Sequence, residues 1–87
     1  MTLDTFSPNI AAIIDGINWH NLKENEAHRL RSFGFEEGAS IYVRHRGILF
    51  WRDPIVVQIG RMTIALRAKT ARHIMLRPAE NQDIGHG

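Results

Sequence analysis

Arg29-Leu-Arg-Ser-Phe-Gly-Phe-Glu-Glu-Gly38 is the stretch that decides the fold of this chain. Leu30 and Phe33 continue an apolar spacing of three residues, which predicts the last turns of a helix. Gly34 suits the left-handed position just after such a helix. Phe35 would then turn back onto Leu30, as in a Schellman motif. The stretch therefore predicts a helix that ends at a defined residue and is followed by a sharp turn.

The second informative stretch is Asp53-Pro-Ile-Val-Val-Gln-Ile-Gly-Arg-Met-Thr-Ile-Ala-Leu-Arg67. Ile55, Val57 and Ile59 alternate with Val56 and Gln58, as expected for a half-buried antiparallel strand. Pro54 lacks a backbone donor and belongs at the start of the first strand, while Gly60-Arg61 supplies a two-residue turn of the Gly-X kind. The stretch therefore predicts a β-hairpin. Its return strand carries Met62, Ile64 and Leu66 on one face.

The residues before the helix predict one strand and a polar loop. Residues 9–17 alternate loosely and stop at Asp15-Gly16, which is a turn signal. Residues 18–25 are polar and lead into the helix. Asn21 or Asn25 could be its N-cap, and Glu24 could complete a capping box with Asn21.

A further strand is predicted from residue 40, because Ile41 and Val43 alternate with polar neighbours. Residues 68–72 predict one turn of helix, and residues 73–76 a final strand that closes on the first. Such closure would remove the exposed edges of the sheet. Seven strand residues are expected in the core, with Leu30 and Phe33 closing one end of it: Ile41, Val43, Ile55, Val57, Ile64, Leu66 and Ile74.

In this order the two quoted stretches make the chain similar to the FeoA family, from about Ala12 to Leu76. The resemblance implies a mainly β fold, a small SH3-like barrel of about five strands with one short inserted α-helix. The domain limits expected are a tail over residues 1–8, the barrel over 9–77 and a flexible tail over 78–87. FeoA-like sequences typically have a short, glycine-containing loop directly before the Asp-Pro pair. This chain departs from that pattern, because Arg52 precedes Asp53 and the loop looks longer.

Composition restricts the function classes. The 87 residues allow one small core and contain no cysteine, so disulfides and thiolate metal sites are excluded. We see no secretion signal and no apolar run of about 20 residues, which predicts a cytoplasmic protein. No nucleophile–base arrangement, P-loop or dinucleotide motif is present, which argues against an enzyme.

Three residues spaced four apart, His20, Glu24 and His28, would share one face of a continuous helix. Imidazole and carboxylate ligands suit zinc or ferrous iron. The alternative, which we favour, is that His20 precedes the helix and all three side chains are solvated. We therefore expect no bound cofactor beyond weak Fe²⁺ or Zn²⁺ binding.

The run Ile48-Leu-Phe-Trp51 is unusual for a hairpin connection, where polar residues are preferred. It could extend the core, or it could anchor a protein interface, because Trp and Arg are enriched at binding hot spots. On the second interpretation, the candidate partner-binding residues are Arg44, Arg46, Leu49, Phe50, Trp51 and Arg52.

The resemblance implies a non-enzymatic accessory or regulatory role in ferrous iron uptake, through binding to the cytosolic part of the FeoB transporter. Two alternatives remain open: a stand-alone relative of the C-terminal SH3-like domain of iron-dependent repressors, and a small nucleic-acid-binding barrel. The second alternative is disfavoured because Arg61, Arg67, Arg72 and Arg77 are scattered and the net charge is only +2. Arg67 could pair with Asp53, Glu36 or Glu37. We expect no membrane insertion, and a weak homodimer is a further option.

Overall fold

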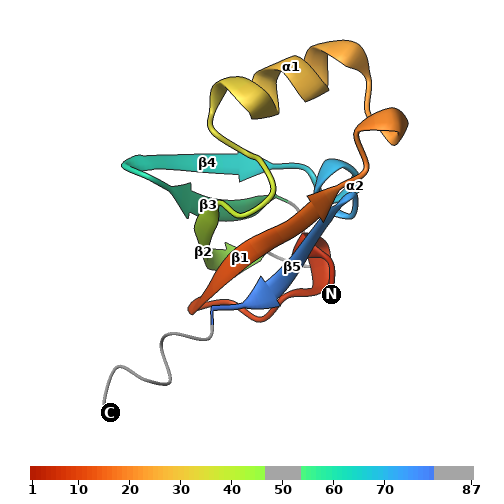
Figure 1. Ribbon diagram of the computed structural model, residues 1–87. Coiled ribbons are helices and arrows are strands. Elements are labelled where there is room, and N and C mark those ends of the chain that lie inside the picture. Colours follow the sequence, from red (N-terminus) through yellow and green to blue (C-terminus); the bar gives the residue numbers. More distant parts are fainter. Residues whose placement is uncertain (47–53, 80–87) are drawn as a thin grey trace.

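The computed structural model describes residues 1–46 and 54–79 (Figure 1). Along the chain lie η1 (Leu3–Thr5), β1 (Ile10–Ile17), η2 (Trp19–Asn21), α1 (Glu24–Ser32), β2 (Ser40–Arg46), β3 (Ile55–Ile59), β4 (Met62–Leu66), α2 (Ala68–Ala71) and β5 (Ile74–Pro78). The five strands form one antiparallel sheet in the order β4-β3-β2-β1-β5. This arrangement confirms the predicted mainly β fold with a short inserted helix.

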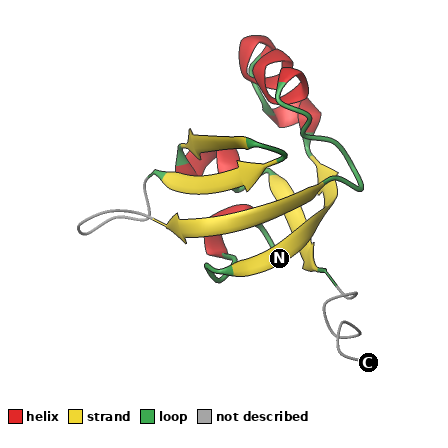
Figure 2. Cartoon of the chain, turned by 90° about the vertical axis from the view of Figure 1, so that its left-hand side faces the viewer, coloured by secondary structure: helices red, strands yellow, loops and turns green. Residues whose placement is uncertain are grey.

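The sheet curls around the core, and α1 projects from one end of it (Figure 2). The two outer strands, β4 and β5, do not pair with each other. The predicted closure of the sheet is therefore incomplete. Among the described residues, β4 pairs with β3 alone, whereas the outer edge of β5 is covered by the start of the chain.

The end of α1 has the predicted Schellman geometry. The amide of Phe35 donates to the carbonyl of Leu30 at 3.0 Å, and the amide of Gly34 donates to that of Arg31 at 3.0 Å. Gly34 has a φ of 95°, a conformation that a Cβ atom disfavours. The helix boundary and the role of the glycine are confirmed.

The predicted N-cap of α1 is wrong. Lys23 occupies the cap position and forms no side-chain capping bond, and Glu24 is the first helical residue. Asn21 lies too early to cap α1, because it ends η2 and its amide donates to the carbonyl of Asn18. Glu24 and Glu26 in the first turn favour this end of the helix through the helix dipole instead.

Two strands contain a β-bulge that the alternation did not reveal. Asp15 is the extra residue of β1, because Ile14 pairs with Leu76 and Gly16 pairs with Met75. The strand therefore continues through the Asp15-Gly16 pair, which the sequence indicated as a turn. In β2, the register with β3 shifts in the same way at Arg44.

The remaining predicted elements are confirmed. Gly60, with a φ of 59°, and Arg61 form the turn between β3 and β4, and Ile59 pairs with Met62 across it. The predicted helical turn corresponds to α2. The predicted last strand corresponds to β5, which pairs with β1.

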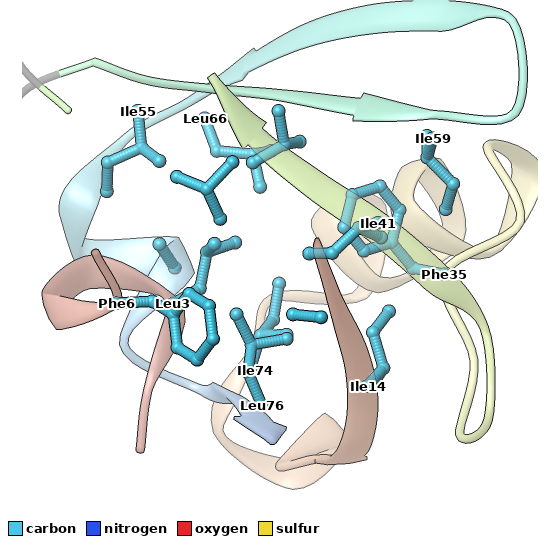
Figure 3. Packing of buried hydrophobic residues seen from close by; sticks show 14 of the residues in the cluster. Leu3, Phe6, Ile14, Phe35, Ile41, Ile55, Ile59, Leu66, Ile74 and Leu76 are labelled. Atoms are coloured by element: carbon cyan, nitrogen blue, oxygen red, sulfur yellow. The ribbon is translucent and has the colours of Figure 1, made fainter. Parts of the chain in front are cut away.

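The core contains all seven strand residues that the alternation predicted. Leu30 is buried as expected, but Phe33 is only half-buried and Phe35 fills the end of the core instead (Figure 3). The reason is the turn at Gly34, which directs Phe35 inward. Phe33 remains at the helix end, where the guanidinium of Arg29 lies 5.5 Å from its ring centroid.

The start of the chain, expected as a tail over residues 1–8, is part of the folded structure. Leu3 and Phe6 are buried in the core, opposite Phe35 (Figure 3). The carbonyl of Met1 accepts a hydrogen bond from the amide of Leu76, and Thr2 pairs with Met75 at the outer edge of β5. Of the expected C-terminal tail, Pro78 ends β5 and Ala79 is buried, and residues 80–87 lie outside the described residues.

Candidate partner-binding surface

The predicted partner-binding residues fall at the junction of β2 and β3. Arg44 is exposed near the end of β2, and Arg46 is the last residue of that strand. Leu49, Phe50, Trp51 and Arg52 lie outside the described residues. The described part of the surface is therefore the outer face of β2 and β3, the two strands that flank residues 47–53 in the sequence.

An open groove of about 420 Å³ runs over that outer face. Its described lining consists of Ala11, Ser40, Ile41, Tyr42, Arg44, Gln58 and Gly60. The lining comes from β1, β2 and β3 and from the β3–β4 turn. None of these residues is acidic, so Arg44 is the only charged group among them.

The polar floor of the groove is organised by Arg44. Its guanidinium donates to Oε1 of Gln58 at 3.4 Å and lies 5.9 Å from the centroid of the Tyr42 ring. Tyr42 is half-buried and pairs with Gln58 across β2 and β3. An aromatic face beside a guanidinium can bind an apolar group and an acidic group of one partner.

Sequence reasoning missed Tyr42 and Gln58 as members of this surface. Strand alternation was sufficient to place Tyr42 on the outer face, opposite to Val43. The position of Gln58 beside it depends on the β2–β3 register. The bulge at Arg44 shifts that register, and the sequence does not reveal the bulge.

The three predicted metal ligands do not share one helix. His20 lies in η2, whereas Glu24 and His28 lie one turn apart on α1, and all three are exposed. Within residues 1–46 and 54–79, no group of three or more histidine and carboxylate side chains is close enough to hold a metal ion. Glu24 and His28 border an open hollow together with Asn25.

Of the four arginines considered for nucleic acid, Arg61 lies in the β3–β4 turn, Arg67 and Arg72 flank α2, and Arg77 lies on β5. Arg77 forms a 2.7 Å ion pair with Asp15, the bulged residue of β1. Arg67 forms no ion pair with Glu36 or Glu37 in the described part of the chain, and Asp53 lies outside it.

None of the described helices has the length and apolar character needed to cross a membrane.

Comparison with protein families gives a match to the FeoA domain over residues 1–78. A search of curated proteins gives no match. Among solved structures, the chain is similar to iron(II) transport protein A of Clostridium thermocellum, with a TM-score of 0.76 and 28% identity. That alignment covers 91% of this chain and 46% of the other, so this chain spans less than half of the length of that protein.

A second similar structure is FeoA of Stenotrophomonas maltophilia complexed with zinc, with a TM-score of 0.71 and 28% identity over 88% of this chain and 89% of that one. That protein is described as a procaryotic SH3 domain protein and a candidate activating factor for ferrous iron transport. T. acidophilum IdeR matches with a TM-score of 0.73 and 19% identity over 91% of this chain and 34% of that chain. The last likeness shows a shared fold alone.

Proposed function

The chain belongs to the FeoA family, and on this premise we propose that it is an accessory protein of ferrous iron uptake that binds the cytosolic part of a FeoB transporter. The observation that carries the proposal is the extent of the family match. It spans residues 1–78 and so includes every helix and strand that the structure describes.

The proposed role is binding and is non-enzymatic. A transporter-binding module needs a surface that is complementary to its partner, and the Tyr42–Arg44 groove supplies an apolar face beside a positive charge. In the sequence, Arg44 of this groove stands seven positions before Trp51, and the proposed partner surface includes both residues. The partner would present an apolar side chain close to a carboxylate. The interaction would take place at the cytosolic side of the membrane.

A binding titration with the soluble cytosolic domain of the FeoB transporter from the same organism tests the proposal. The wild-type chain should bind, and the Arg44→Glu variant should bind at least about tenfold more weakly, because like charges then face each other across the interface. Arg72→Glu, an exposed change at the end of α2, is the matched control and should bind normally. Failure of the wild-type chain to bind would overturn the proposal.

A nucleic-acid-binding role predicts a different result in a binding titration. A barrel that binds DNA or RNA through its arginines would lose affinity steeply as the salt concentration rises. Binding of duplex DNA or RNA with that dependence, in the absence of transporter binding, would favour the alternative. The transporter interaction should instead tolerate moderate salt, because its apolar contacts are not screened.

A further inference from the structure

The β4 strand leaves one edge of the sheet open. It stands at the end of the strand order, and β3 is its only strand partner among the described residues. The opposite edge, on β5, is covered by Met1 and Thr2. Open edges present unpaired amide and carbonyl groups, which can pair with another strand.

The register identifies the groups at this edge. Ile59 and Met62 flank a two-residue turn, so they form a hydrogen-bonded pair, and every second pair along the hairpin does the same. Thr63 and Ala65 therefore direct their amide and carbonyl groups away from β3. Both residues are exposed, and no backbone hydrogen bond outside the β3–β4 ladder involves either of them within the described part of the chain.

A crevice lies between this edge and α1. Its volume is about 240 Å³, and its lining comes from both sides: Glu26, Arg29 and Leu30 of α1, then Ala65, Leu66, Arg67 and Thr70. Figure 1 shows α1 above β4. Two of its lining residues, Leu30 and Leu66, are apolar and buried. An extended backbone lying against β4 would thus have a helix on its other side.

The charges of the crevice favour an acidic occupant. Arg29 and Arg67 are both exposed, and neither forms an ion pair with any described carboxylate. The one acidic group, Glu26, already accepts a hydrogen bond from the hydroxyl of Thr70 at 3.2 Å. Two guanidinium groups therefore remain available to a carboxylate.

We propose that the β4 edge and this crevice bind an extended acidic peptide segment of a partner protein, which adds to the sheet as a sixth strand. The proposal goes beyond the transporter role, because the site lies apart from the Tyr42–Arg44 groove and shares no lining residue with it. Backbone hydrogen bonds to Thr63 and Ala65 supply the affinity, and the arginines select the charge.

A second copy of the chain fits this edge less well. Two β4 strands paired antiparallel about Ile64 would bring Arg61 of one copy against Arg67 of the other. Like charges directly opposite each other destabilise a strand pair. An acidic segment meets the same positions with complementary charge.

The test uses the blocked synthetic peptide Thr-Val-Glu-Val-Glu-Val and its Gln-for-Glu analogue, with amide hydrogen exchange and backbone NMR shifts as the readouts. The acidic peptide should slow the exchange of the amides of Thr63 and Ala65 and shift resonances of β4 and α1. The analogue should bind about tenfold more weakly, because it lacks charge-assisted bonds. No binding of the acidic peptide, or binding without protection of these two amides, would overturn the proposal.

Two pairs of variants sharpen the result. Ala65→Pro removes one outward amide but no bond to β3, so it should fold and lose the peptide, whereas Ala65→Thr keeps the amide and should bind. Arg29→Glu combined with Arg67→Glu should reverse the preference toward a lysine-containing peptide, and Arg72→Glu should change nothing. Normal peptide binding by a folded Ala65→Pro variant contradicts strand addition. Protection of Thr63 and Ala65 that rises with protein concentration and without peptide would assign the edge to a second copy instead.

Discussion

The hydroxyl of Thr70 donates to Oε2 of Glu26 across 3.2 Å and so connects α2 to α1, two helices whose contact residues are far apart in the sequence. Thr70 is the one polar residue buried in the described part of the chain. The bond fixes the first turns of α1 beside the end of β4. It is therefore a structural support for the crevice as well as for the fold.

The first prediction concerns this bond. Thr70→Val keeps the shape of the side chain but removes the donor, and should lower the free energy of unfolding by about 1 kcal/mol. Thr70→Ser, which keeps the hydroxyl, should lose less through that bond. Urea unfolding monitored by circular dichroism measures both. Equal stability of the wild type and the valine variant would show that the bond contributes nothing.

The second prediction concerns the turn after α1. Gly34→Val should cost on the order of 1–2 kcal/mol or more, because a β-branched residue is poorly tolerated at a φ of 95°. Gly34→Asn should cost less, because asparagine tolerates positive φ better than other residues that carry a side chain. Thermal melts of the two variants give the comparison. An unchanged melting temperature for the valine variant would contradict the assigned strain.

A third prediction tests the contribution of the start of the chain. Phe6→Ala should lower stability by about 3–5 kcal/mol, as truncation of a buried aromatic side chain does elsewhere. Ser7→Ala, an exposed neighbour, should have little effect. Chemical unfolding of both proteins checks the difference. A small effect at Phe6 would mean that the first residues pack loosely in solution.

Trp51 provides the fourth prediction. If it anchors the partner, Trp51→Ala should weaken binding to the transporter domain by roughly 2 kcal/mol and leave folding almost unchanged. A tryptophan in the core would instead cost about 3–5 kcal/mol of folding stability. A melt and a binding titration on this one variant distinguish the two. A folded variant with normal affinity would remove Trp51 from the interface.

The fifth prediction concerns metal. Zn²⁺ should bind weakly at most, through Glu24 and His28 with a neighbouring molecule completing the coordination, because His20 lies on a different element. Binding should weaken as the pH falls, since protonated imidazole cannot bind a metal ion. Calorimetry on the wild type and on a His20→Ala, His28→Ala variant checks this. Sub-micromolar binding by the monomer that disappears in the variant would contradict it.

Local patterns were enough to predict most of the fold. The helix end at Gly34 and the turn at Gly60 follow from backbone preferences that few residues other than glycine satisfy, and alternation identified the buried side of each strand. The patterns failed where tertiary contacts decide. Phe33 and Phe35 are equally apolar, and only the direction of the chain after Gly34 determines which one enters the core.

The same limit applies to the candidate site. Arg44 was identified because it flanks an apolar run, but its neighbours Tyr42 and Gln58 come together through the β2–β3 register. The β4 crevice was missed for a similar reason. Its two arginines are separated by 38 positions (67 minus 29), and only the fold brings them to one crevice.

The pairing of β1 with both β2 and β5 has a consequence for how the chain folds during synthesis. Ile14 is made well before its partner Leu76, so the sheet cannot be completed until β5 has left the ribosome. Pairings of such long range are slow to form. The β2–β4 meander is local and can form first. During that interval the edge of β1 that later pairs with β5 is open, and the charge of Asp15 disfavours pairing of this edge with other chains.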